Sequence, residues 1–239
     1  MTPGITAALK GESARGKSGQ VTVRARTNFA ASYFAGAGHL AALCREVETS
    51  RVGVVFDQLP QGESVRHVYY CIAAVMFAVS ALDAYAKEAF YDKKKELRGI
   101  TEAKRKRAFE KARRRIKLKL KSAPLILVNY ESILTLSGLS ELDLDATDVK
   151  EVRLLIFTRD ALVHVQPEWR DEKKTHARIG KALEKIGFSP NPFLPPKSVF
   201  FPERCMGYGM AEWATRTATD FANKFRPVVG DDGVFGPYI

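Results

Sequence analysis

Three residues near the end of one expected helix, Arg159, Asp160 and His164, have the types and spacing to carry chemistry. Arg159 follows Ile156 by three residues and Val152 by seven, so it falls on the apolar stripe of that helix. An unpaired guanidinium in a protein core is costly, so Arg159 needs an anionic partner. A structural ion pair and a functional anion-binding site both meet this need, and the breach of the apolar pattern favours the functional interpretation.

On a regular helix, these three side chains point in two different directions. Arg159 and His164 are five residues apart, about 140° round a regular helix, so they do not share a face. Asp160 and His164 are four apart and do share one, so the carboxylate could orient the imidazole. For Arg159 and His164 to act on one phosphate, the helix must deform near Pro167 or two copies must meet. The second option predicts a homodimer with a composite site.

Other common catalytic and metal-binding patterns are absent from the sequence. There is no HExxH, CxxC, GxSxG or GxxxxGK[ST], so metalloprotease, thiol-redox, esterase and P-loop functions lack support. Cys44, Cys71 and Cys205 show no metal-ligand spacing, and an odd number of thiols fits a reducing cytoplasm. The sequence therefore predicts neither a metal nor a cofactor.

Two acidic residues and two histidines elsewhere have more than one interpretation. Asp83 and Glu88, near the end of a long expected helix, could point at the same site as the residues above. Lys87 follows Asp83 by four residues, however, and an ordinary surface ion pair is at least as good an interpretation. His39 and His67 are interpreted as structural side chains.

One segment, 93–121, carries the whole positive excess of the chain. It holds 15 Lys and Arg against three Glu, whereas the remaining residues hold 23 Lys and Arg against 24 Asp and Glu. A near-neutral body with one cationic element suggests a polyanionic partner, most often nucleic acid. A solvated face and a membrane-surface helix are the alternatives, and the thin apolar seam argues against the second. The candidate RNA contacts are Lys104, Arg105, Lys106, Arg107, Lys111, Arg113, Arg114, Arg115 and Lys117.

The spacing of apolar residues predicts an all-α chain built round a helical bundle. The helix expected to begin at the cap Ser64 is apolar almost all round in its middle third, so it should be central. Thr101 and Asp145 are expected to start two further helices. The expected helices cover about 28–48, 64–92, 101–123, 124–136, 145–166, 172–186 and 208–225.

The chain is expected to divide into three parts. Residues 1–27, rich in glycine, serine and basic residues, form a flexible arm; 28–187 form the helical domain; and 188–239 form a proline-rich loop and a C-terminal helical extension. The longest uncharged run has 15 residues, too few to span a bilayer, and the N-terminus lacks an apolar signal core. We expect a cytoplasmic protein with no membrane partner.

The residues from Arg159 to His164 resemble the R-x4–6-H signature of HEPN domains. The preceding segment AVMFAVSALDAYAKEAF resembles the long central helix of those domains. The resemblance covers about 64–166. A second match to the signature, Arg170 and His176, lies in a charged stretch after a proline and is interpreted as solvated surface.

The resemblance implies an activity and a set of roles. Many HEPN proteins are all-α, metal-independent endoribonucleases of toxin–antitoxin and antiphage systems that cleave RNA at a dimer interface. By resemblance, His164 acts as general acid or base, Arg159 stabilises charge on the phosphate and Asp160 holds the imidazole. The expected products carry 2′,3′-cyclic phosphate ends, and the expected partners are RNA, a second copy and an antitoxin or defence protein. The alternative is a non-catalytic RNA-binding or protein-interaction module that uses segment 93–121.

Overall fold

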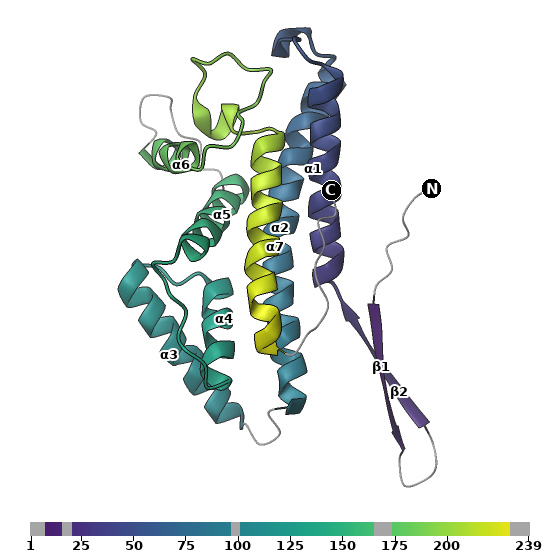
Figure 1. The fold of residues 1–239 in the computed structure, drawn as a ribbon, viewed down its shortest axis with the longest axis vertical. Coiled ribbons are helices and arrows are strands. Elements are labelled where there is room, and N and C mark those ends of the chain that lie inside the picture. The colour runs from purple at the N-terminus through teal and green to yellow at the C-terminus, as the bar shows by residue number, and fades with distance from the viewer. Residues whose placement is uncertain (1–7, 16–20, 97–100, 165–173, 230–239) are drawn as a thin grey trace.

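The computed structural model describes residues 8–15, 21–96, 101–164 and 174–229. Its body is all-helical, as predicted (Figure 1). A 3₁₀ turn, Phe56–Gln58, and a short helical turn, Phe200–Arg204, lie in two of the connections. The helices are α1 (Ala30–Ser50), α2 (Gln61–Glu96), α3 (Glu102–Leu120), α4 (Leu125–Leu136), α5 (Thr147–Val163), α6 (Lys174–Glu184) and α7 (Tyr208–Val229).

Helices α1, α2 and α7 lie side by side, with α1 at one edge of the bundle (Figure 1). Helix α2 also contacts α4 and α5, so the predicted central position of this helix is confirmed. Helix α7, expected as an extension, instead belongs to the core: Trp213 and Phe221 are each 1% exposed. Burying aromatic side chains of this size contributes about 2–3 kcal/mol each.

The apolar composition of α2 is explained by its place in the core. By length and composition alone, its stretch Gln61–Ala89 is able to cross a membrane. In the bundle, Ala74, Val75, Ala78 and Val79 are fully buried against neighbouring helices. An apolar helix of this kind is expected at the centre of a helical bundle.

Two of the three predicted helix caps are wrong. The side chain of Thr101 caps α3 by accepting from the backbone N–H three residues on. Helix α2, however, begins at Gln61, and the Ser64 hydroxyl donates to the Gln61 carbonyl inside its first turn. The Asp145 carboxylate does not cap α5, because it lies 2.6 Å from Lys119 Nζ of α3 and forms an ion pair there. A tertiary partner has replaced the local one.

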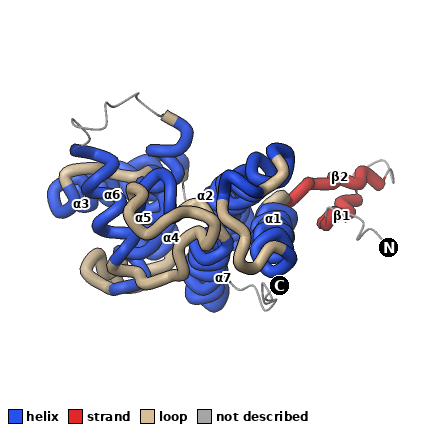
Figure 2. Tube along the Cα trace, turned by 90° about the horizontal axis from the view of Figure 1, so that it is seen from above, coloured by secondary structure: helices blue, strands red, loops and turns tan. Residues whose placement is uncertain are grey.

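The N-terminal segment expected as a flexible arm contains two paired strands. Strand β1 (Ala8–Arg15) runs antiparallel to β2 (Val21–Asn28), with Ala8 opposite Asn28 and Arg15 opposite Val21. Figures 1 and 2 show this hairpin standing off the bundle beside the start of α1. The alternation in VTVRAR, 21–26, is a period-two strand signal that the prediction of a flexible arm overlooked. The all-α prediction therefore holds for the body alone.

Candidate functional site

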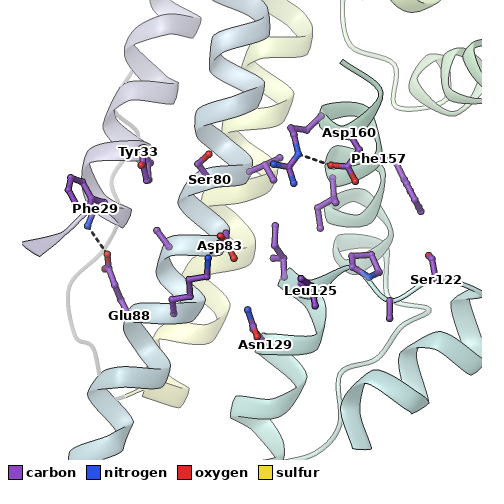
Figure 3. A pocket seen from close by; sticks show the side chains of 18 of the residues that line it. Phe29, Tyr33, Ser80, Asp83, Glu88, Ser122, Leu125, Asn129, Phe157 and Asp160 are labelled. Atoms are coloured by element: carbon purple, nitrogen blue, oxygen red, sulfur yellow. Dashed lines mark hydrogen bonds and ion pairs between the residues drawn. The ribbon is translucent and has the colours of Figure 1, made fainter. Parts of the chain in front are cut away.

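A cleft of about 1020 Å³ opens beside α5, where the start of α1, the C-terminal half of α2 and the start of α4 face it (Figure 3). Its walls carry aromatic and aliphatic side chains, among them Tyr33, Leu125 and Phe157. Such a mixture of apolar walls and convergent polar groups is typical of a ligand site. The charged and amide side chains that line the cleft are Asp83, Lys87, Glu88, Asn129, Arg159 and Asp160.

Arg159 reaches the cleft from the apolar side of α5. Val152, Leu155 and Ile156 of the same helix are buried, as the predicted stripe requires, whereas the Arg159 side chain is 31% exposed. Arg159 Nε lies 2.8 Å from Asp160 Oδ1, an ion pair without hydrogen-bond alignment. Asp160 therefore supplies the anionic partner that the sequence required. A partly exposed pair of sequence neighbours is weak, so an incoming phosphate could compete for this guanidinium.

His164 does not share the cleft with Arg159. It is exposed, it ends α5 as the C-cap residue with φ −108° and ψ 46°, and it is not among the residues that line the cleft. Its backbone N–H donates to the Asp160 carbonyl at 2.9 Å, but no described side chain is paired with its ring. The expected contact between the Asp160 carboxylate and the imidazole is therefore absent from the described structure. The calculated separation of Arg159 from His164 agrees with this arrangement.

Asp83 and Glu88 line the cleft as proposed, and each also has a structural role. Asp83 Oδ2 lies 2.5 Å from Lys87 Nζ, which is the surface ion pair offered as the alternative. Glu88 Oε1 accepts from the backbone N–H groups of Phe29 at 2.6 Å and Ala30 at 3.0 Å. Glu88 therefore caps the N-terminus of α1, which has no capping side chain of its own.

Three cations of α3, which we call its inner side, pair with acidic residues of the same chain. The inner side is Lys111, Arg115 and Lys119. Arg115 Nη1 lies 2.8 Å from Oε1 of Glu131, a carboxylate that is 1% exposed, and Arg115 Nε lies 2.8 Å from Glu141 Oε2. Arg115, one of the predicted RNA contacts, therefore has a structural role in this fold, because its guanidinium neutralises a buried carboxylate.

The inner-side pairs also involve the acidic turn between α4 and α5. Lys111 Nζ lies 3.3 Å from Glu141 Oε1, and both side chains of this pair are exposed. Hydrogen bonding and charge attraction from Lys119 lower the pKa of Asp145 below its ordinary value. Three cations of the basic segment therefore have anionic partners in the same chain.

A second set of α3 cations, which we call its outer side, is Lys106, Arg107, Arg113, Arg114 and Lys117. All five are exposed and form no ion pair with a described acidic side chain. They project away from the buried Ala108, Ala112 and Ile116. Lys104 is exposed as well, while Arg105 is half-buried beside Glu102. Among the predicted nucleic-acid contacts, Lys104 and the outer side are therefore the ones that are exposed and lack a described acidic partner.

A group of metal-ligand side chains that the sequence analysis missed lies between α1 and α2. Ligand atoms of Cys44, Glu48 and His67 all lie within 4.8 Å of one another. The signal that could have found them is two pairs of residues four apart, Cys44 with Glu48 and His67 with Cys71. Burial raises the pKa of all three thiols, that of Cys205 to about 12, so none is a nucleophilic thiolate at neutral pH.

Two other histidines have clear positions. His176, interpreted as solvated surface, is instead 8% exposed and packs edge-to-face on Phe201, with ring centroids 5.4 Å apart. The prediction failed because α6 turns this side chain inward together with Leu183. Arg170 of the same motif match lies outside the described residues. His39 is exposed on α1 and does not line the cleft.

Comparisons of the chain with protein-family models, with curated proteins and with solved structures found no match.

Proposed function

We propose that this protein is a HEPN-like endoribonuclease of toxin or antiphage-defence type that cleaves RNA without a catalytic metal. The observation that carries the proposal is that Arg159 of α5 lines a large cleft and precedes His164 in the spacing Arg159-x4-His164. RNA contains its own nucleophile, the 2′-hydroxyl. The protein therefore has to supply only a phosphate-binding cation and a group that moves protons.

The proposed active site is shared between two copies of the chain. His164 is exposed at the end of α5, while Arg159 faces the cleft, so the two side chains of one protomer point to different places. Two α5 ends meeting about a two-fold axis would bring the His164 of each copy towards the Arg159 of the other. In this arrangement Arg159 stabilises the charge that develops on the phosphate, and His164 transfers the proton.

The outer side of α3 supplies RNA affinity in this proposal. Its five cations and Lys104 are the exposed positive groups of α3 that lack a described acidic partner. Six phosphate contacts to single-stranded RNA would give a slope of about −4 in log K against log salt. Such contacts bind RNA without reading its sequence.

The test is a cleavage assay on total RNA in EDTA, with equal folding and dimerisation checked for each variant. We expect His164→Ala to reduce cleavage by about 10²–10⁴-fold and to leave RNA affinity nearly unchanged. Arg159→Ala should give a similar loss, because it removes stabilisation of the developing charge. His39→Ala and Arg216→Ala are matched controls, since both residues are exposed and neither lines the cleft. Wild-type activity in both catalytic variants would refute the proposal.

The second candidate function is a non-catalytic RNA-binding module of similar architecture. The separation of His164 from the cleft and the exposure of the outer-side cations favour this reading. A binding module would lose RNA affinity when the outer side is neutralised and would show no cleavage in any variant.

A further inference from the structure

The group formed by Cys44, Glu48 and His67 lies in the part of the bundle remote from the cleft. Glu48 follows Tyr33, a cleft residue, by 15 positions on α1, which is about 22 Å along the helix axis. His67 is fully buried, Cys44 is fully buried, and the side chain of Glu48 is 15% exposed. The group is therefore separate from the site of the proposed function.

The two helices present these side chains by the same geometry. Residues four apart lie on one helix face, so Cys44 and Glu48 of α1 face the same way, as do His67 and Cys71 of α2. Helices α1 and α2 contact each other along their length. Paired helices that each contribute two inward-facing donors are a common way to build a metal site in a helical bundle.

Hydrogen bonds within the group do not use all of its potential metal-ligand atoms. His67 Nε2 lies 2.8 Å from Glu48 Oε1, while His67 Nδ1 is buried and has no hydrogen-bond partner in the described structure. The Cys44 thiol reaches only the His67 carbonyl, at a long 3.7 Å. The buried His67–Glu48 pair provides a partner for one ring nitrogen and one carboxylate oxygen. It explains neither the second nitrogen nor the thiol.

We propose that Cys44, Glu48 and His67 bind one divalent transition-metal ion of the zinc class. A thiolate, an imidazole and a carboxylate are zinc ligands, whereas calcium and magnesium prefer sites made of oxygen alone. On binding, the Cys44 thiol releases one proton to solvent. The thiolate and the carboxylate then carry two negative charges, which the ion balances in a buried site.

The metal has a structural role that follows from its neighbours. Glu48 Oε1 also accepts from the Tyr208 backbone N–H at 2.7 Å, at the N-terminus of α7. A side chain at Gly207 would come within 2.7 Å of the same oxygen, so glycine is required for this close approach. The ion would thus join α1, α2 and α7.

The test uses the full chain, refolded from denaturant under reducing conditions with Co²⁺ because the donor atoms are buried. Metal content is measured by elemental analysis and ligation by the thiolate-to-cobalt charge-transfer band. We expect about one ion per chain in wild type and in Cys205→Ser, a buried thiol outside the three-residue group. Cys44→Ser should lose the band and at least tenfold in affinity.

Two results would overturn the proposal. The first is a folded wild-type chain that holds no stoichiometric Zn²⁺ as purified or Co²⁺ after refolding. The second is an unchanged band in Cys44→Ser, which would place the thiolate elsewhere. Cys44→Ser changes one atom, so it keeps the test valid if a substitution of His67 prevents folding. Neither result depends on RNA cleavage, so this proposal and the proposed function can fail separately.

Discussion

The inner and outer sides of α3 both carry basic side chains, but only those of the inner side form ion pairs within the protein. The inner side meets Glu131, Glu141 and Asp145 at distances of 2.6–3.3 Å and so fixes α3 to α4 and to the acidic turn after it. The outer side has no described acidic partner. The basic residues of α3 therefore do not form one functional unit. Among them, the cations that have intramolecular partners belong to the fold, and the remainder are available for a ligand.

Removal of Arg115 should have the largest effect on stability among the α3 cations. Arg115→Ala should lower the free energy of unfolding by about 3 kcal/mol, because it leaves the Glu131 carboxylate buried without its cation. Arg114→Ala, one residue away on the outer side, should change stability by less than about 0.5 kcal/mol. Denaturant unfolding of both variants measures the difference. Equal small effects would show that the inner side is also only a solvated face.

Neutralising the outer side should weaken RNA binding while stability is kept. The triple variant Arg113→Ala, Arg114→Ala and Lys117→Ala removes three phosphate contacts, so the salt slope should fall by about 2. Fluorescence titrations of single-stranded RNA at several salt concentrations measure this slope. An unchanged slope would mean that RNA, if bound, is bound elsewhere.

Glu88 tests whether a residue that lines the cleft acts in the fold. Glu88→Ala removes the cap of α1 and should cost about 1 kcal/mol of stability. Glu46→Ala, an exposed glutamate on α1, is the matched control. If Glu88→Ala abolished cleavage at unchanged stability, Glu88 would belong to the catalytic group instead.

The smallest expected effect is on the loss of stability at low pH. The pKa of Asp145 is lowered in the folded protein by Lys119, so the ionised carboxylate favours the folded state. This contribution is complete above the ordinary aspartate pKa of about 3.9 and is lost as pH falls through the lower folded-state value. Wild type should therefore lose slightly more stability than Asp145→Asn between about pH 5 and 3. Equal pH profiles in thermal unfolding would contradict the pairing.

Features that depend on neighbouring residues could be predicted from the sequence. Apolar spacing gave the helices, the cap at Thr101 and the buried stripe of α5 with Arg159 at its edge. The separation of Arg159 from His164 also follows from helix geometry alone.

Features that depend on distant residues could not be predicted in this way. Glu88 caps a helix that begins 58 positions earlier, and Asp145 leaves its expected cap to meet Lys119. The group of Cys44, Glu48 and His67 requires knowing that α1 and α2 pair in one register. Periodicity gives each helix its faces but does not say which faces meet.

We propose that Arg159 and His164 from two copies of the chain cleave RNA together. Mixing two inactive variants tests this shared site directly. His164→Ala and Arg159→Ala proteins would be unfolded, mixed and refolded, and cleavage of total RNA would be measured in EDTA. In a shared site, one of the two sites of a mixed dimer is intact, so the mixture should recover about a quarter of wild-type activity. Each variant refolded alone should remain inactive. A mixture as inactive as its components would contradict the composite site, and full activity in either variant alone would contradict the assignment of these residues.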